Sequence, residues 1–246
     1  MNLRMAIFFM ICAVAVVFAA FFFRKPVSSA ESLAWIEEAP VQPSGEKTPI
    51  IIELFTSEGC SSCPPADVLL MQLEEKQPVA GAQIIALSEH VDYWNRLGWA
   101  DPYSSALFSQ RQSEYSQAFG LRDIYTPQMV VDGKAEFVGS NIKRAHELIT
   151  EAVNAPKAKL DIVLAFKAQA KEIPVTVSIQ SLPEITAGDS AEVLLAIAES
   201  NLNSNVLRGE NSGRKLAHTA VVRKLQNIGK IDTAKQNFQI IAPPRW

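Results

Sequence analysis

Alternating apolar and polar segments between residues 49 and 156 predict strands and helices in turn. Ile50–Phe55 and Gln83–Leu87 are short, mainly apolar runs, which are typical of buried strands. Apolar residues recur at helical spacing in Pro64–Lys76 and Ala106–Phe119, and a further helix is predicted from Asn141 to Val153, before a proline. This part of the chain therefore has the pattern of an α/β protein.

A hairpin is predicted between the second and third of these helices. Gln128–Val131 and Ala135–Val138 flank Asp132-Gly133, a pair that favours the positive φ angles of a tight hairpin turn. Strands joined through a helix lie parallel, whereas hairpin strands lie antiparallel. We therefore expect a mixed sheet with helices on both faces.

The pattern changes after residue 157. Alternating apolar positions predict strands at Leu160–Phe166 and Val175–Ile179, and Ala191–Glu199 is a longer apolar run. Turn-forming residues separate these runs. We expect residues 157–246 to form a small antiparallel domain, similar to a β-sandwich.

The N-terminal pattern is that of an export signal. The basic segment Met1–Arg4 precedes the uncharged apolar run Met5–Phe23, and small residues follow as far as Ala30. Residues 1–30 are either a signal peptide, cleaved after Ala30, or a retained signal anchor. Residues 31–48 contain several prolines and fit a linker. Both alternatives place the protein outside the cytoplasm, periplasmic or secreted, with membrane contact only through an uncleaved N-terminal segment.

Charge argues against nucleic acid as a partner. The chain carries 23 Lys and Arg against 26 Asp and Glu, a formal net charge of −3. Removal of residues 1–30 would take away three basic residues and no acidic one, which makes the remainder more acidic. Nucleic-acid binding depends on clustered Lys and Arg, so we expect none.

Two cysteines carry the most direct chemical signal. Of the three cysteines, Cys12 lies in the N-terminal apolar run, while Cys60 and Cys63 form a Cys-x-x-Cys between a strand and a helix. Pro64 and Pro65 lack N–H donors and fit the first turn of a helix, which places both thiols at its start. We expect Cys60 to be the exposed attacking thiol and Cys63 the buried resolving thiol.

The charges around this motif favour an unionised thiol. Between residues 48 and 75 there is no Lys, Arg or His, whereas Glu53, Glu58 and Asp67 lie close in sequence. Acidic neighbours disfavour a thiolate. We therefore predict a reducing or isomerising role rather than a strongly oxidising one.

The motifs together resemble a known family. Glu53–Asp67, His90–Trp94, Leu97–Trp99 and Tyr125–Gly133 are similar to the exported bacterial family known as domain of unknown function 1223, and the likeness continues through Arg208–Arg214. The resemblance implies a thioredoxin-like fold for residues 49–156 and an extracytoplasmic location, but no substrate. It also implies that the β-rich part, residues 157–246, is incomplete at its C-terminal end.

The resemblance further implies the composition of the site. Pro127 would form a cis peptide bond and face the first cysteine, while the backbone of Thr126 pairs with an extended substrate. Tyr125, Ser61 and Ser62 would complete the substrate-binding surface.

Four further residues are candidates to support the site. Glu53 lies on the strand before the cysteines, where thioredoxin-like proteins carry a buried acid that moves the proton of the resolving thiol. His90, Trp94 and Trp99 follow the second strand, and such segments border the ligand crevice in open α/β sheets. Packing against the fold is the alternative role for the two tryptophans.

The sequence is also compatible with other roles for the two cysteines. The two cysteines could form a permanent structural disulfide, or bind copper together with His90. A closed zinc site would need more ligands than the sequence offers, and we expect no resident metal or cofactor. The polar residues Arg208, Glu210, Asn211 and Arg214 fit a surface turn better than a site.

The leading hypothesis is an exported thiol-disulfide oxidoreductase that acts on protein or small-molecule thiols and disulfides. A metal-handling module and a redox-inactive scaffold of the same fold are the alternatives.

Overall fold

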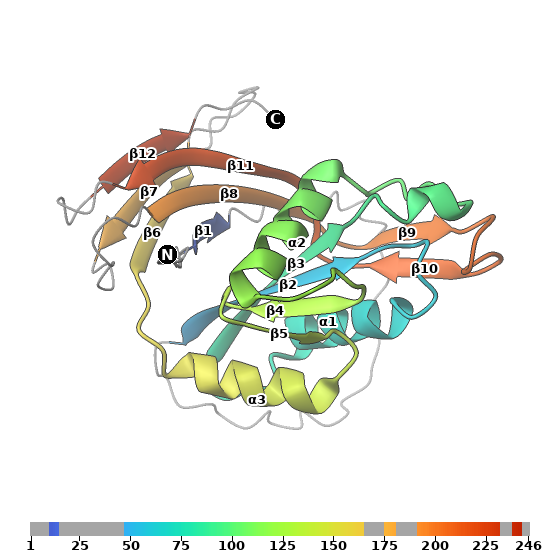
Figure 1. Ribbon diagram of the computed structural model, residues 1–246. Helices are drawn as coiled ribbons and strands as arrows, with labels where there is room; N and C mark the ends of the chain where they lie inside the picture. Colours follow the sequence, from blue (N-terminus) through green and yellow to red (C-terminus); the bar gives the residue numbers. More distant parts are fainter. Residues whose placement is uncertain (1–9, 15–46, 165–174, 181–190, 232–237, 243–246) are drawn as a thin grey trace, which may run out of the picture.

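A seven-stranded mixed sheet forms the centre of the protein (Figure 1). The computed structural model describes residues 10–14, 47–164, 175–180, 191–231 and 238–242. The strands of the large sheet are, in spatial order, β1 (Met10–Val14), β8 (Ala191–Glu199), β11 (Val221–Ile231), β3 (Ala82–His90), β2 (Thr48–Thr56), β4 (Gln128–Val131) and β5 (Ala135–Val138). The helices are α1 (Pro64–Lys76), α2 (Ala106–Phe119), α3 (Ile142–Val153) and the short 3₁₀ helix η1 (Asn95–Leu97).

The direction of the strands follows from their connections. β2 and β3 are joined through α1 and run parallel, with Thr48 opposite Ala82 and Thr56 opposite His90. β4 lies antiparallel to β2 on its other side, and β5 pairs antiparallel with β4. The prediction of a mixed sheet is confirmed. In the order β3-β2-β4-β5, β2 lies between β3 and β4, so its C-terminal end lies in the interior of the sheet and not at an edge.

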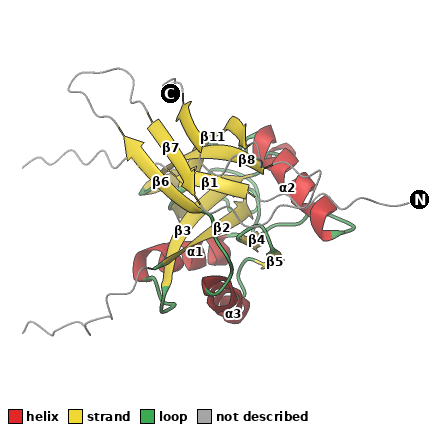
Figure 2. Cartoon of the chain, turned by 90° about the vertical axis from the view of Figure 1, so that its left-hand side faces the viewer, coloured by secondary structure: helices red, strands yellow, loops and turns green. Residues whose placement is uncertain are grey.

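Helices cover both faces of this sheet (Figure 2). α1 and α3 pack on one face, where their apolar residues join Ile50, Ile52 and Leu54 of β2. On the opposite face, Phe108 of α2 packs against Phe55 of β2. Successive side chains of a strand point to opposite faces, so β2 contributes to both cores.

The tight turn and the helix start that the sequence predicts are both present in the structure. Asp132 and Gly133 have φ angles of 50° and 65°, which allow the tight turn between β4 and β5. Asn141 precedes α3 and its side chain accepts a hydrogen bond from the backbone N–H of Arg144 at 3.0 Å. This bond satisfies one of the unpaired N–H groups at the helix start.

The C-terminal strands are arranged differently from the expected separate domain. β8 and β11 are antiparallel to each other, but β11 also pairs with β3 through Val221 and Ser88, so both strands extend the large sheet. A separate antiparallel sheet contains β6 (Lys159–Leu164), β7 (Val175–Gln180) and β12 (Phe238–Ala242). A domain boundary at residue 157 is therefore not confirmed.

A two-stranded hairpin, β9 (Leu202–Asn205) and β10 (Lys215–His218), projects from the β8–β11 pair towards the start of α1 (Figure 1). β10 and α1 are in contact.

Only five residues of the N-terminal segment are described. Met10–Val14 forms β1 and pairs in parallel with β8. The remainder of the predicted export signal and nearly all of the predicted linker lie outside the described residues. Within the described part of the chain, no helix is both long and apolar enough to cross a membrane.

Candidate functional site

The two cysteines of the Cys-x-x-Cys form a disulfide between the end of β2 and the start of α1. The Cα atoms of Cys60 and Cys63 are 5.4 Å apart. Pro64 and Pro65 occupy the first helical positions, as predicted. The backbone N–H groups of Ala66 and Asp67 both donate to the carbonyl of Cys63, at 2.8 and 3.1 Å. The helix thus begins directly at the second cysteine.

The expectation that Cys60 is exposed is wrong. Both cysteines have no exposed surface, whereas Ser61 and Ser62 between them are exposed. The loop between β9 and β10 lies against this segment, because Asn211 bonds to the backbone of Cys60 across 151 residues of sequence. Asn211 in this loop is itself fully buried beside the disulfide.

Three hydrogen bonds attach this loop to the Cys-x-x-Cys segment. The Asn211 side-chain Nδ2 donates to the carbonyl oxygens of Glu58 and Cys60, at 2.9 Å each. The backbone N–H of Ser61 donates to Glu210 Oε2 at 2.9 Å. Hydrogen bonds from the side chain and the backbone of Ser61 lower the pKa of Glu210. The surface turn expected around Glu210 and Asn211 is therefore part of the site.

Pro127 lies beside the first turn of α1. The peptide bond between Thr126 and Pro127 is cis, in agreement with the expectation from the resemblance. Gly139 shows the proximity: a Cβ atom built on it would lie 3.2 Å from the Cβ of Ala66 and 3.3 Å from that of Pro127. Since Ala66 is three residues after Cys63, Pro127 lies next to the helical turn that begins at the second cysteine.

Trp94 connects the proline loop with the cysteine segment. Its Nε1 donates to the hydroxyl of Thr126 at 2.8 Å. A Cβ atom on Gly59, directly before Cys60, would lie 3.1 Å from the Cβ of Trp94. The structure therefore brings Trp94 to the site predicted for it.

Tyr125 makes its side-chain contact elsewhere. Its hydroxyl donates to Glu136 on β5, and burial together with this carboxylate raises the pKa of Tyr125. Its backbone carbonyl accepts a bond from Gln112 of α2 at 2.7 Å. No described contact joins the Tyr125 ring to the cysteine segment.

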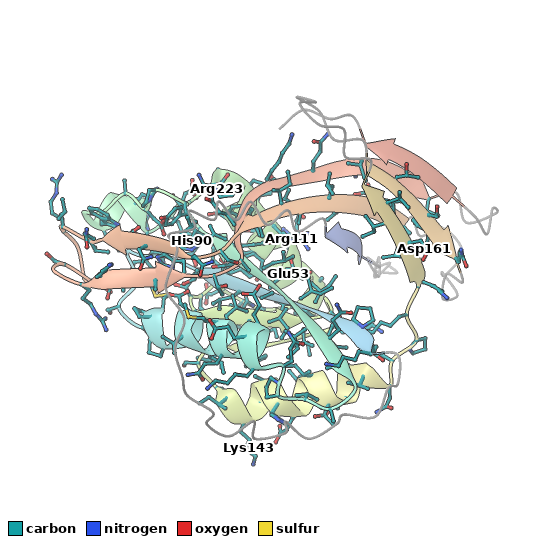
Figure 3. The ribbon with its side chains drawn as sticks, turned by 180° about the vertical axis from the view of Figure 1, so that it is seen from behind. Glu53, His90, Arg111, Lys143, Asp161 and Arg223 are labelled. Carbon is teal, nitrogen blue, oxygen red and sulfur yellow. A yellow bond between two sulfur atoms is a disulfide. The ribbon has the colours of Figure 1, made fainter. Side chains whose placement is uncertain are left out.

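Glu53 lies on the other face of the sheet from α1. Its Oε2 is 2.5 Å from Nε of Arg111 (Figure 3). Its Oε1 accepts a bond from the hydroxyl of Tyr115 at 2.5 Å. Both partners belong to α2, whereas Ile52 and Leu54, the neighbours of Glu53 on β2, face α1 and α3. The expectation that Glu53 supports the cysteines is therefore wrong. Side chains alternate between the two faces along β2, and that of Glu53 lies on the face covered by α2.

Asp67 is the acid on the cysteine side. It lies four residues after Cys63 in α1, so the two side chains share one helix face. Asp67 is 8% exposed and accepts a bond from the hydroxyl of Thr56 at 2.8 Å. Burial raises its pKa, although His90 and His218 favour its charged form.

Two histidines and two more acids form a buried cluster next to Asp67. His90 Nδ1 is 2.7 Å from Asp101 Oδ2, and His218 Nε2 is 2.9 Å from Glu58 Oε1. The two imidazole rings meet edge to face, with centroids 4.9 Å apart. All four side chains are almost completely buried, and His90 is marked in Figure 3.

Within this cluster, His90 and Asp101 stabilise each other's charged forms. Burial opposes the charged form of His90, but Asp101 outweighs it and raises the pKa of His90. Burial likewise opposes the charged form of Asp101, but His90 lowers the pKa of Asp101. The pair is therefore an ion pair. Trp99 Nε1 also donates to Glu58 Oε2 at 2.7 Å, so Trp99 supports the segment before Cys60.

No metal site accompanies these residues in the described part of the chain. No group of three His, Cys, Asp or Glu side chains is placed there to bind a metal ion. Two buried ring nitrogens, Nε2 of His90 and Nδ1 of His218, have no hydrogen-bond partner among the described residues.

The sequence interpretation did not assign roles to Asp67, Asp101, Asn211 and His218. Helical spacing from Cys63 could have identified Asp67. No local signal could have identified Asn211 or His218, because their partners are more than 150 residues away.

The fold and site define a mixed α/β protein with a covered Cys-x-x-Cys disulfide at the start of a helix. The chain belongs to the family DUF1223, described as proteins of unknown function, whose profile matches residues 51–246. No curated protein matches the chain.

Two solved structures are similar to this one. The crystal structure of protein AGR_C_4864 from Agrobacterium tumefaciens has 26% sequence identity and a TM-score of 0.64, covering 81% of this chain and 80% of that one. HBP35 of Porphyromonas gingivalis has 14% identity and a TM-score of 0.54, covering 80% of this chain and 64% of that one. The second similarity concerns the fold alone.

Proposed function

We propose that this protein is an exported thiol-disulfide oxidoreductase of thioredoxin type. The observation that carries the proposal is the placement of the Cys60–Cys63 disulfide at the start of α1, with Pro127 beside the same helical turn. The strand order β3-β2-β4-β5, with helices on both faces, supports a thioredoxin-like fold. Substrates are protein or small-molecule disulfides and thiols.

The reaction of the reduced protein has two steps. The Cys60 thiolate attacks one sulfur of a substrate disulfide, which forms a mixed disulfide and releases the other substrate sulfur as a thiolate. The Cys63 thiolate then attacks Cys60 Sγ, which restores the intramolecular disulfide and releases the second substrate thiolate. The substrate gains two electrons and the cysteine pair loses two.

Asp67 is the candidate proton acceptor in the second step. Cys63 must lose its proton before it attacks, and Asp67 is the buried acid one helical turn away. Its raised pKa keeps it closer to the value of a thiol than an exposed carboxylate would be. The released proton then protonates the departing thiolate.

The cysteine roles are tested with the full chain in a Cys12→Ser background, where only the two site thiols remain. We expect disulfide reduction on a model protein such as insulin, and no activity in Cys60→Ser. Cys63→Ser should accumulate a mixed disulfide at Cys60, visible by mass spectrometry. Activity that survives Cys60→Ser would exclude this mechanism.

The role of Asp67 is tested by its pH profile. Asp67→Asn should slow the second step about tenfold or more near pH 6 to 7, with a smaller loss at higher pH, where Cys63 ionises without help. Stopped-flow measurement of mixed-disulfide decay separates this step from the first attack. Glu114→Gln, an exposed substitution on α2, is the matched control. An unchanged pH profile in Asp67→Asn would remove Asp67 from the mechanism.

Export follows from the N-terminal segment as a proposal of its own. The basic start, the apolar run and the small residues before Ala30 support a periplasmic or secreted protein, or one anchored in the membrane with its soluble part outside. Cleavage would also remove β1 from the edge of β8. Cell fractionation and the N-terminal sequence of the mature protein test this proposal, and a protein found only in the cytoplasm would contradict it.

A further inference from the structure

The disulfide is closed to attack in the conformation described here. A thiolate must reach one sulfur of a disulfide to exchange with it. Neither Cys60 nor Cys63 has any exposed surface. An oxidoreductase with this site therefore needs a movement that uncovers a sulfur atom, and the loop between β9 and β10 is hydrogen-bonded to the backbone of the cysteine segment.

Segment 206–214, between β9 and β10, contacts the cysteine segment through Glu210 and Asn211. Val206 and Arg214 close the loop, since the N–H of Val206 donates to the Arg214 carbonyl at 2.9 Å. Asn211 is held from within the loop as well, because its Oδ1 accepts a bond from Arg214 Nη1 at 2.8 Å. These bonds within the loop hold the Asn211 amide in position to donate to the carbonyls of Glu58 and Cys60.

This loop also packs against the segment that follows η1. A Cβ atom on Gly209 would lie 3.1 Å from the Cβ of Trp99, and Gly209 has a φ of 77°. A Cβ atom on Gly98 would lie 3.8 Å from the backbone nitrogen of Gly209. Two glycines therefore allow the two backbones to approach each other closely.

The hairpin that carries the loop has no third strand beside it. β9 and β10 have four residues each and pair only with each other. β10 is anchored near its base, where His218 Nε2 lies 2.9 Å from Glu58 Oε1, whereas the loop at the tip is bonded to the cysteine segment through Glu210 and Asn211. At its base the chain bends on both strands, where Asn201 and Ala220 have positive φ angles of 64° and 48°. The β8–β11 pair continues into β9–β10 through these two bends (Figure 1).

We propose that segment 206–214 is a gate, locked by Asn211, that must open before any thiol reaches the Cys60–Cys63 disulfide. This inference deepens the proposed function, because it names the element that regulates access to that site. The lock consists of the two bonds from Asn211 Nδ2, and the Glu210–Ser61 bond adds a third contact at the rim. Opening breaks all three and exposes the sulfur of Cys60.

The test measures access and not turnover. The full chain, in the Cys12→Ser background, is treated with dithiothreitol, and the appearance of the two thiols is followed by rapid alkylation. Asn211→Ala removes both lock bonds and should increase the reduction rate roughly tenfold, because each hydrogen bond contributes modestly to the closed state. Asn203→Ala, on exposed β9, is the matched control and should leave the rate unchanged.

Two further measurements keep the test decisive. If Asn211→Ala does not fold, as judged by circular dichroism, Glu210→Ala removes only the contact to Ser61 and should still increase the rate. The wild-type disulfide should also be reduced at least tenfold more slowly than the same disulfide in a peptide of residues 58–66.

A wild-type rate equal to that of the peptide, or an unchanged rate in Asn211→Ala, would overturn the gate. Failure of the proposed function would instead appear as no reduction of insulin by a protein whose disulfide still opens faster in Asn211→Ala.

Discussion

Glu53 forms a buried ion pair with Arg111, and this pair can be used to test whether Glu53 acts outside the cysteine site. Arg111 Nε is 2.5 Å from Glu53 Oε2, and the side chains are 12% and 1% exposed. Glu89 lies 3.5 Å from the same Nε atom. Burial and the nearby Glu53 raise the pKa of Glu89 well above its ordinary value, which favours its neutral form. Arg111 is therefore the cation that balances Glu53.

Arg111→Met keeps the aliphatic volume and removes this cation. The substitution leaves a buried carboxylate unpaired, which costs about 3–5 kcal/mol. Since domains of this kind are stable by about 5–15 kcal/mol, the loss is a large part of the total. Urea unfolding followed by the fluorescence of the four tryptophans measures it.

A double-mutant cycle separates the pair from the volume change. Glu53→Gln in the Arg111→Met background should recover part of the stability, since no unpaired carboxylate remains. Arg144→Met is the matched control: Arg144 Nη1 lies 3.2 Å from Glu147 on the surface, with both side chains 43% exposed. Its loss should stay below about 1 kcal/mol.

Two results would refute this reasoning. One is a loss below about 1 kcal/mol in Arg111→Met, and the other is a double variant no more stable than the single one. In the redox assay, Glu53→Gln should leave the pH profile of mixed-disulfide decay unchanged, in contrast to Asp67→Asn. A changed profile would return Glu53 to the site.

Three further substitutions test local features. Gly139→Ala should destabilise the protein by about 1–3 kcal/mol, because the new Cβ would lie 2.8 Å from Cδ1 of Leu54; thermal unfolding with no loss would contradict this. Asn141→Ala removes the cap that accepts from Arg144 and should cost about 1 kcal/mol in urea unfolding, so an unchanged midpoint would disprove the cap. Glu89 has a raised pKa in the folded state, so its contribution to stability is present at acidic pH and is lost as pH rises above about 4.5. Glu89→Gln should therefore become more stable relative to the wild type between pH 5 and pH 8, and a constant difference across that range would contradict the shift.

Features that depend on neighbouring residues were predictable from the sequence. The start of α1 at Pro64 and the tight turn at Asp132-Gly133 follow from the backbone preferences of two or three residues. The strands and helices between 48 and 153 follow from hydrophobic periodicity, which reports the buried face of each element. The spacing of Cys60 and Cys63 likewise indicated two thiols that can react with each other, and the structure joins them in a disulfide.

The position of the C-terminal strands was not predictable in this way. An apolar run identified β8 as a strand, but the partner of a strand is determined by contacts between distant segments. The parallel pairing of Val221 with Ser88, which joins β11 to the large sheet, is such a contact. Strands of a separate domain and strands that extend the first sheet show the same hydrophobic periodicity, so this pattern does not distinguish the two arrangements.

By itself, the sequence determined the elements of this protein and the pair of thiols at a strand-to-helix junction, because those depend on local chemistry. Only the tertiary structure decided which acid accompanies the thiols and whether they are accessible. The pleat of β2 turns Glu53 towards Arg111, and α1 brings Asp67 to the cysteine side. Asn211 closes the site across 151 residues of sequence, and such a contact exists only once the chain has folded.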